Sequence, residues 1–175
     1  MFKGLTEMEK TTISNRSIKL FTLSAIYLGT KALLAKTKTG QINGQEEQLA
    51  IEFWNEVAKY IPDWTLVKER KATAAEMRRE YIHSHGLALH VLGMVGATLL
   101  AAEPRRWSER LKSLSNVDWS RSNSALWEGR ALVGGRVSKA YSNVLLTSAA
   151  VKKVLDLPLS PEETRLEGHI SSWKK

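Results

Sequence analysis

The chain has 175 residues, 43% of them hydrophobic and 25% charged, which is typical of one folded domain and argues against wholesale disorder. It contains no cysteine, so disulfides, thiolate nucleophiles and cysteine-ligated zinc are excluded, and the composition fits a reducing cytoplasm. The formal net charge of +8 favours an anionic partner.

The start of the chain carries no pattern of a packed element. Nothing before Ser14 is typical of a strand or a helix, so residues 1–13 are expected to be a leader or a flexible segment. No signal-type apolar region follows Met1, so export is not indicated. We expect residues 1–175 to form a single domain, and the abrupt start suggests the C-terminal part of a longer protein.

Apolar residues at intervals of three and four, with few β-branched runs, predict an all-α fold. We expect a single compact helical domain of about six to eight helices. The first predicted helix covers residues 18–34, with Ser14 or Asn15 as its N-cap, and a polar loop follows it. The second covers residues 46–60 and is stopped by Pro62.

The middle of the chain predicts a buried helix. A helix from residue 73 to 80 is expected to continue, or to bend at residues 84–86, into an apolar stretch over residues 86–102. That stretch is shorter than a membrane span and is interrupted by His90 and three glycines, so we interpret it as a core helix and expect no membrane partner.

Four further helices are predicted after residue 106. They cover residues 107–114, residues 124–132 before the Gly134–Gly135 break, and a segment through Leu155 that Asn143 or Thr147 caps. The last begins at Ser160, where a serine, a proline and two glutamates form a helix-start signature.

Positive charge is concentrated in two blocks. Residues 105–153 hold ten Lys and Arg against three acidic residues, and residues 1–40 hold seven against two. Residues 41–104 and the tail after Lys153 are slightly negative. Because a surface of one sign is typical of nucleic-acid binding, we expect the two blocks to converge on one face.

The run over residues 118–143 combines three arginines, one lysine, two tryptophans and three glycines. Arginine binds phosphate oxygens bidentately, indole rings can stack on bases, and Gly134–Gly135 can form a small nest of amides for a phosphate. The alternative is a loop with its tryptophans in the core and its arginines in solvent. At least one of Trp119 and Trp127 is expected to anchor the run in the core.

Histidines are concentrated near residue 85. Glu80 and His83 are three positions apart, a spacing that can chelate a metal, but di-iron bundles need two such pairs. They remain minor metal candidates against a polar helix face with satisfied histidines, and no catalytic residue or cofactor is predicted. An enzyme using His83 or His85 as acid or base would need a pocket that joins them to the basic run.

Five segments, in order along nearly the whole chain, carry a family resemblance. They cover residues 9–27, 81–86, 118–123, 127–130 and 134–138. They resemble the C-terminal half of DndB proteins, the DNA sulfur-modification-associated family. Longer members carry an N-terminal Asp-Gly-Gln-His-Arg motif that this sequence lacks, so the resemblance implies a C-terminal fragment or a shortened member.

In such systems, partner enzymes replace a non-bridging phosphate oxygen of DNA by sulfur, and DndB-like proteins are associated with regulation through promoter DNA. The resemblance therefore implies a DNA-binding regulator, not the sulfur-transfer enzyme. Its expected partner is double-stranded DNA, with other DNA sulfur-modification proteins and a second copy of the chain as further partners. A competing hypothesis is a scaffold whose tryptophans and apolar helices bind those proteins.

The candidate DNA contacts are polar side chains from both basic blocks, and their expected role is to position the phosphate backbone. They are Arg16, Lys19, Arg121, Asn123, Arg130, Arg136 and Lys139.

Overall fold

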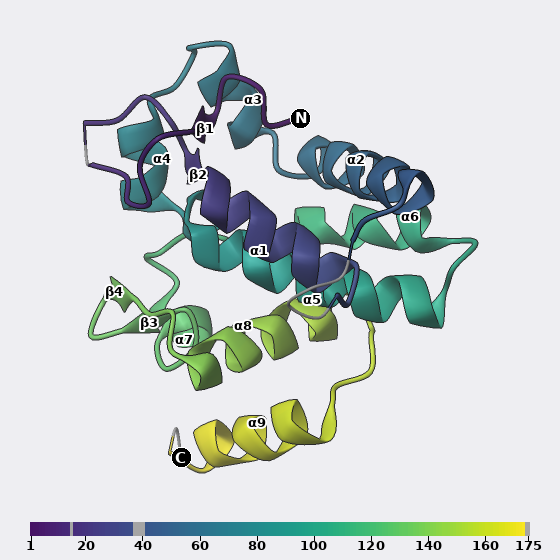
Figure 1. Ribbon diagram of the computed structural model, residues 1–175. Coiled ribbons are helices and arrows are strands. Elements are labelled where there is room, and N and C mark those ends of the chain that lie inside the picture. Colours follow the sequence, from purple (N-terminus) through teal and green to yellow (C-terminus); the bar gives the residue numbers. More distant parts are fainter. Residues whose placement is uncertain (15, 37–40, 174–175) are drawn as a thin grey trace.

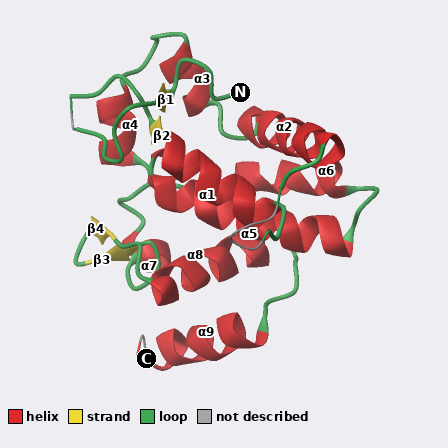
Figure 2. Cartoon of the chain, in the orientation of Figure 1, coloured by secondary structure: helices red, strands yellow, loops and turns green. Residues whose placement is uncertain are grey.

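A computed structural model describes residues 1–14, 16–36 and 41–173, with side chains as far as residue 170. In these ranges nine α-helices and two short 3₁₀ helices are present, and the strands are limited to two pairs of two residues (Figures 1 and 2). The predicted all-α fold is confirmed. The helices exceed the expected number by one because of a short helix that was not predicted, α3 (Asp63–Lys68), whereas the predicted helices α6 (Trp107–Arg110) and α7 (Ser124–Trp127) are single turns.

Two parallel helices, α1 (Leu23–Leu33) and α5 (Gly86–Ala102), form the centre of the molecule (Figure 1). A Cβ built on Gly93 would lie 2.0 Å from the carbonyl oxygen of Gly29, so glycine is required for this close approach. Gly86 faces Ala25 at one end and Gly96 faces Leu33 at the other. Both helices therefore begin at the same end of the molecule.

The remaining helices cover this pair. Figure 1 shows α8 (Tyr141–Val154) below α5 and α9 (Pro161–Trp173) below α8, in agreement with their contacts. The 3₁₀ helix η2 (Leu111–Asn116) contacts both α8 and α2 (Gly44–Lys59). Within the described residues, no helix combines the length and the apolar character that a membrane crossing requires.

Local capping signals explain where several helices begin. Asn43 and Glu46 form a capping box at α2, and Thr73 and Glu76 form one at α4 (Ala74–Glu80). At α9 the predicted start is confirmed, because the amide of Glu163 donates to Ser160 Oγ and the Ser160 amide donates back to the Glu163 carboxylate.

The N-terminal region differs from expectation. Helix α1 begins at Leu23 with Thr22 as its N-cap, not near Ser14, and Asn15 lies outside the described residues. The expected unpacked start is wrong for residues 1–7: Leu5 is buried, and β1 (Thr6–Glu7) pairs in parallel with β2 (Phe21–Thr22). The apolar residues at positions 2 and 5 fill the core beside this pair.

The basic run also differs from expectation. Helix α7 ends at Trp127, and the following residues form a hairpin of β3 (Leu132–Val133) and β4 (Arg136–Val137). Gly134 and Gly135 make its turn with positive φ values of 58° and 72°, which favour glycine. Helix α8 begins at Tyr141, before both expected caps, and a short helix α3 (Asp63–Lys68) follows Pro62 where none was predicted.

Candidate anion-binding site

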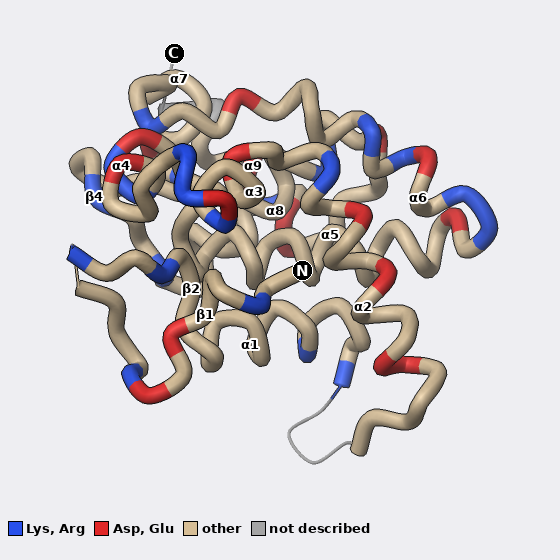
Figure 3. Tube along the Cα trace, turned by 90° about the horizontal axis from the view of Figure 1, so that it is seen from above, with Lys and Arg blue, Asp and Glu red and all other residues tan. Residues whose placement is uncertain are grey.

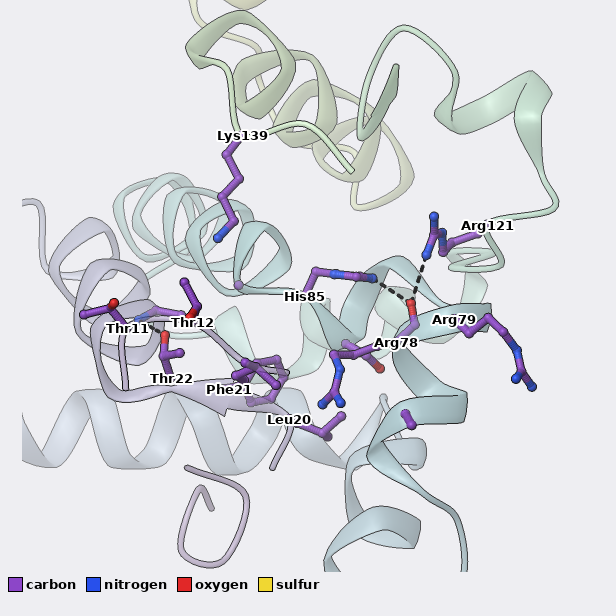
Figure 4. A pocket seen from close by; sticks show the side chains of 15 residues that line it. Thr11, Thr12, Leu20, Phe21, Thr22, Arg78, Arg79, His85, Arg121 and Lys139 are labelled. Atoms are coloured by element: carbon purple, nitrogen blue, oxygen red, sulfur yellow. Dashed lines mark hydrogen bonds between the residues drawn. The ribbon is translucent and has the colours of Figure 1, made fainter. Parts of the chain in front are cut away.

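A cavity of about 670 Å³ lies at the end of the molecule where α1 and α5 begin (Figure 4). Its walls come from residues 11–13, the β2–α1 junction, α4, the start of α5, and two residues of the basic run. Four of the lining side chains are cationic: Arg78, Arg79, Arg121 and Lys139. No Asp or Glu is among the described residues that line the cavity. A site with this charge balance attracts anions.

Arg78 holds the N-terminal loop against α4. Its guanidinium donates to the carbonyl oxygens of Ser14 and Ser17 at 3.2 and 3.0 Å, and also to that of Lys19. Burial lowers the pKa of Arg78, but arginine stays protonated at any physiological pH. The residue therefore positions one wall of the cavity and adds a fixed positive charge to it.

The carbonyl oxygen of Arg78 joins two other lining residues (Figure 4). It accepts hydrogen bonds from His85 Nε2 at 2.8 Å and from Arg121 at 3.0 Å, and Arg121 also donates to the Gly135 carbonyl at 2.8 Å. Arg121 thus ties the β3–β4 hairpin to the C-terminal part of α4.

His85 is neutral at physiological pH. Burial is the main cause that lowers its pKa to about 4; the hydrogen bond to the Arg78 carbonyl opposes this, and the charges of Arg121, Arg78 and Lys139 lower it further. The proton on Nε2 is the one that the Arg78 carbonyl accepts. His85 is therefore a neutral positioning group in the wall.

The side chains of Lys139 and Arg79 point in different directions (Figure 4). Figure 4 shows the Lys139 amine pointing into the cavity, and this nitrogen would lie 3.8 Å from a Cβ built on Gly86. No ion pair within the described residues involves Lys139. Arg79 instead pairs with Glu80, its Nε 2.8 Å from Oε1, and its guanidinium points away from the other cations (Figure 4).

The remaining sequence candidates have different environments. Arg16 and Arg136 are exposed, on the N-terminal loop and on β4. Lys19 donates from Nζ to the Gly4 carbonyl at 2.9 Å. Asn123 is the N-cap of α7 and donates to Asp118, so its amide is used locally.

Arg130 has a structural role. Its guanidinium binds both carboxylate oxygens of Glu167 in α9, at 2.9 and 3.0 Å, and donates to the Leu126 carbonyl at 3.0 Å. Its side chain is 12% exposed. In this conformation the Arg130 guanidinium is not available to phosphate, because it already binds the Glu167 carboxylate.

The tryptophans and the glycine nest of the basic run are also satisfied internally. Trp119 and Trp127 are both buried and stack on each other at 5.6 Å, which confirms the predicted core anchor and leaves neither indole face for a base. The amides of Gly134 and Gly135 donate to the Glu128 carboxylate at 2.5 and 3.2 Å. The nest thus holds an anion supplied by the chain itself.

The minor metal candidates do not converge. Glu80 pairs with Arg79, whereas His83 Nε2 lies 3.0 Å from Asp63 and its Nδ1 lies 3.0 Å from Ser84 Oγ. Over the described part of the chain, no group of three or more His, Asp or Glu could hold a metal ion.

The expected convergence of the basic blocks is partial. Arg121 and Lys139 meet the segment over residues 11–22 at the cavity. Residues 105–112, in contrast, follow the far end of α5, roughly 25 Å away by the rise of a 17-residue helix. Figure 3 shows basic residues at both places, near β4 and α4 and again beyond α6.

Sequence reasoning missed the α4 contribution. Arg78 and Arg79 belong to a region counted as slightly negative, so its average charge concealed them. The signal that could have found them is their position just before Tyr81, where the family-like segment with His85 begins.

A helical domain with a cationic, carboxylate-free cavity defines a protein suited to binding an anion. Over residues 1–158 of the 175, the chain matches the DndB family, described as DNA-sulfur modification-associated. The chain therefore belongs to the DndB family, and through it to the proteins involved in DNA sulfur modification. No curated protein and no solved structure matches it.

Proposed function

We propose that this chain is a DNA-binding regulatory component of a DNA sulfur-modification system, acting on double-stranded DNA in the cytoplasm. Family membership supports the system, and the cationic end of the molecule supports the ligand. One observation carries the proposal. Arg121 and Lys139 of the basic run line the same cavity as the N-terminal segment, and no carboxylate is among the described residues that line it.

The contacts with DNA come from exposed side chains around this end. Arg16 and Arg136 are exposed, and the loop and hairpin that carry them lie on the same side of the molecule as α4 (Figures 1 and 3). Lys139 lines the cavity at this end, and Lys19 supports the loop by donating to the Gly4 carbonyl. Such contacts position a phosphate backbone and carry no base sequence.

The test is duplex binding measured by fluorescence anisotropy at two salt concentrations, with a promoter duplex and a random duplex. We expect both to bind and an unrelated duplex to compete. Arg136→Gln should weaken binding of both duplexes alike. Arg106 is an exposed arginine at the opposite end of α5, so Arg106→Gln should leave binding of both duplexes unchanged. Absence of duplex binding by the wild-type chain would overturn the proposal.

A protein-binding scaffold is the second candidate. Four apolar side chains on and just before α1 are 47–72% exposed: Ile18, Leu23, Tyr27 and Leu28. A surface of this kind can bind another component of the modification machinery. Four of the six tryptophans do not contribute as expected, because they are buried: Trp54, Trp64, Trp119 and Trp127. Normal duplex binding by a Tyr27→Ser variant that no longer associates with such a protein would support the scaffold.

Binding is favoured over catalysis. The cavity joins His85 to the basic run, which an enzyme would need. However, a pKa of about 4 makes His85 a poor base near neutral pH, and its Nε2 is held by a carbonyl. The adjacent Ser84 is fully buried, and its hydroxyl is hydrogen-bonded to His83.

A further inference from the structure

The cavity offers more than the exposed cations that the DNA proposal uses. Its volume of about 670 Å³ falls within the roughly 300–1,000 Å³ typical of small-molecule sites. A duplex presents its phosphates along the outside of a wide rod and contacts surfaces, not concave sites of this size. The exposed Arg16 and Arg136 can therefore serve the duplex while the cavity takes a smaller anion.

We propose that the cavity binds a terminal phosphate group, a phosphomonoester dianion, such as that of a mononucleotide. This goes beyond the duplex binding proposed above, because it assigns a separate ligand to the cavity.

Two cations of the cavity, Lys139 and Arg121, have N–H donors left for a phosphate. The Lys139 amine points into the cavity and has no ion pair within the described residues. Arg121 uses two N–H groups for carbonyl oxygens, and a guanidinium has five, so donors remain for phosphate oxygens. Arg78 adds a fixed positive charge behind them.

The fold strengthens the preference for an anion. Both α1 and α5 begin at this cavity, and the N-cap of α5, His85, makes no side-chain hydrogen bond to its first turn. The positive ends of two helices thus add to the charge of the side chains. The close contact between Gly86 and Ala25 fixes these two ends side by side.

The cluster of cationic side chains favours a terminal phosphate over a diester. A monoester presents three oxygens and up to two charges, and one substituent leaves the site, whereas a diester carries one charge and has two substituents that must both leave. Leu20 and Phe21 add apolar groups to the lining and Thr11 and Thr12 add hydroxyls, so the non-phosphate part has surfaces to contact.

A terminal phosphate has two sources, a free nucleotide and the phosphorylated end of a DNA strand. Calorimetry on the full chain distinguishes them with four probes: deoxyadenosine monophosphate, deoxyadenosine, and a hairpin oligonucleotide with or without its 5′-phosphate. Preference for the monophosphate over the nucleoside with equal binding of the two hairpins indicates the free nucleotide. Tighter binding of the phosphorylated hairpin indicates a strand end.

Lys139→Gln is the decisive variant, because Lys139 is exposed and its loss should not unfold the chain. We expect it to weaken monophosphate binding at least about tenfold, as for the loss of one hydrogen bond from a charged donor. Arg106→Gln is the matched control and should bind like the wild type. Equal binding of monophosphate and nucleoside by the wild-type chain, or unchanged binding by Lys139→Gln, would overturn the inference.

The two proposals fail separately. Arg136→Gln should weaken binding of a duplex whose ends are both closed by loops and should leave monophosphate binding unchanged. Because a closed duplex has no terminal phosphate, its binding tests only the DNA proposal. A wild-type chain that binds the closed duplex but does not bind the monophosphate would therefore refute the cavity assignment alone.

Discussion

Gly93→Ala tests the close packing of α1 on α5 that brings both helix starts to the cavity. The new Cβ would lie 2.0 Å from the Gly29 carbonyl oxygen, where even a short carbon–oxygen contact requires about 3.3 Å. This oxygen belongs to backbone and cannot rotate away, so the helices must separate by about 1 Å. Overpacking of this kind costs roughly 1–3 kcal/mol or more, against a gain of about 1 kcal/mol from the better helix propensity of alanine.

We therefore expect Gly93→Ala to lower the free energy of unfolding by about 1–2 kcal/mol, measured by urea denaturation. Gly168→Ala in α9 is the matched control, because no atom lies within 4 Å of its new Cβ. It should raise the free energy of unfolding by about 1 kcal/mol. If the two variants were equally stabilised, the parallel contact between α1 and α5 would be wrong.

Three other outcomes follow from buried groups. Trp127→Ala should cost about 3–5 kcal/mol in chemical denaturation, and an unchanged melting temperature would contradict its core role. Glu163→Gln leaves the buried Lys152 without its carboxylate and should cost about 3–5 kcal/mol, whereas the exposed Glu162→Gln should cost less than about 1 kcal/mol. Because the pKa of His85 falls from 6.5 to about 4 on folding, the unfolded chain binds its proton more tightly. Stability should therefore fall by about 3 kcal/mol as the pH drops from 6.5 to 4, and a His85→Gln variant that kept this fall would refute the assignment.

The helical elements could be predicted where the signal is local. The Ser160 cap of α9 depends on neighbours within one turn, and both are visible in the sequence. The apolar stretch that forms α5 is equally local. The strand at Thr6–Glu7 was not predictable in this way, because its partner lies fifteen positions later, at Phe21–Thr22.

The site was harder to predict, because charge alone does not tell a free cation from a paired one. Arg130 and Arg136 both lie in the basic run over residues 118–143, yet Glu167, 37 positions after Arg130, binds the first, whereas the second is exposed. Arg78 was missed for the opposite reason. Its importance comes from carbonyl groups about 60 positions earlier in the chain, which no local pattern reveals.

The acidic groups of α9 modify the basic run directly. Burial opposes ionisation of Glu167, but hydrogen bonds from Arg130 and Lys153 outweigh it and lower the pKa of this carboxyl. Glu167 therefore stays charged at neutral pH and removes Arg130 from the cationic surface. Helix α9 begins after residue 158, where the family match ends.

The most direct test of the central claim is the salt dependence of closed-duplex binding by the wild-type chain, Arg136→Gln and Arg106→Gln. If phosphate contacts at the α4 and β4 end hold the duplex, the slope of log affinity against log salt should shrink by about 0.9 in Arg136→Gln and stay at the wild-type value in Arg106→Gln. Affinity for promoter and random duplexes should fall together. No measurable binding by the wild-type chain, or the same slope in all three proteins, would contradict the account.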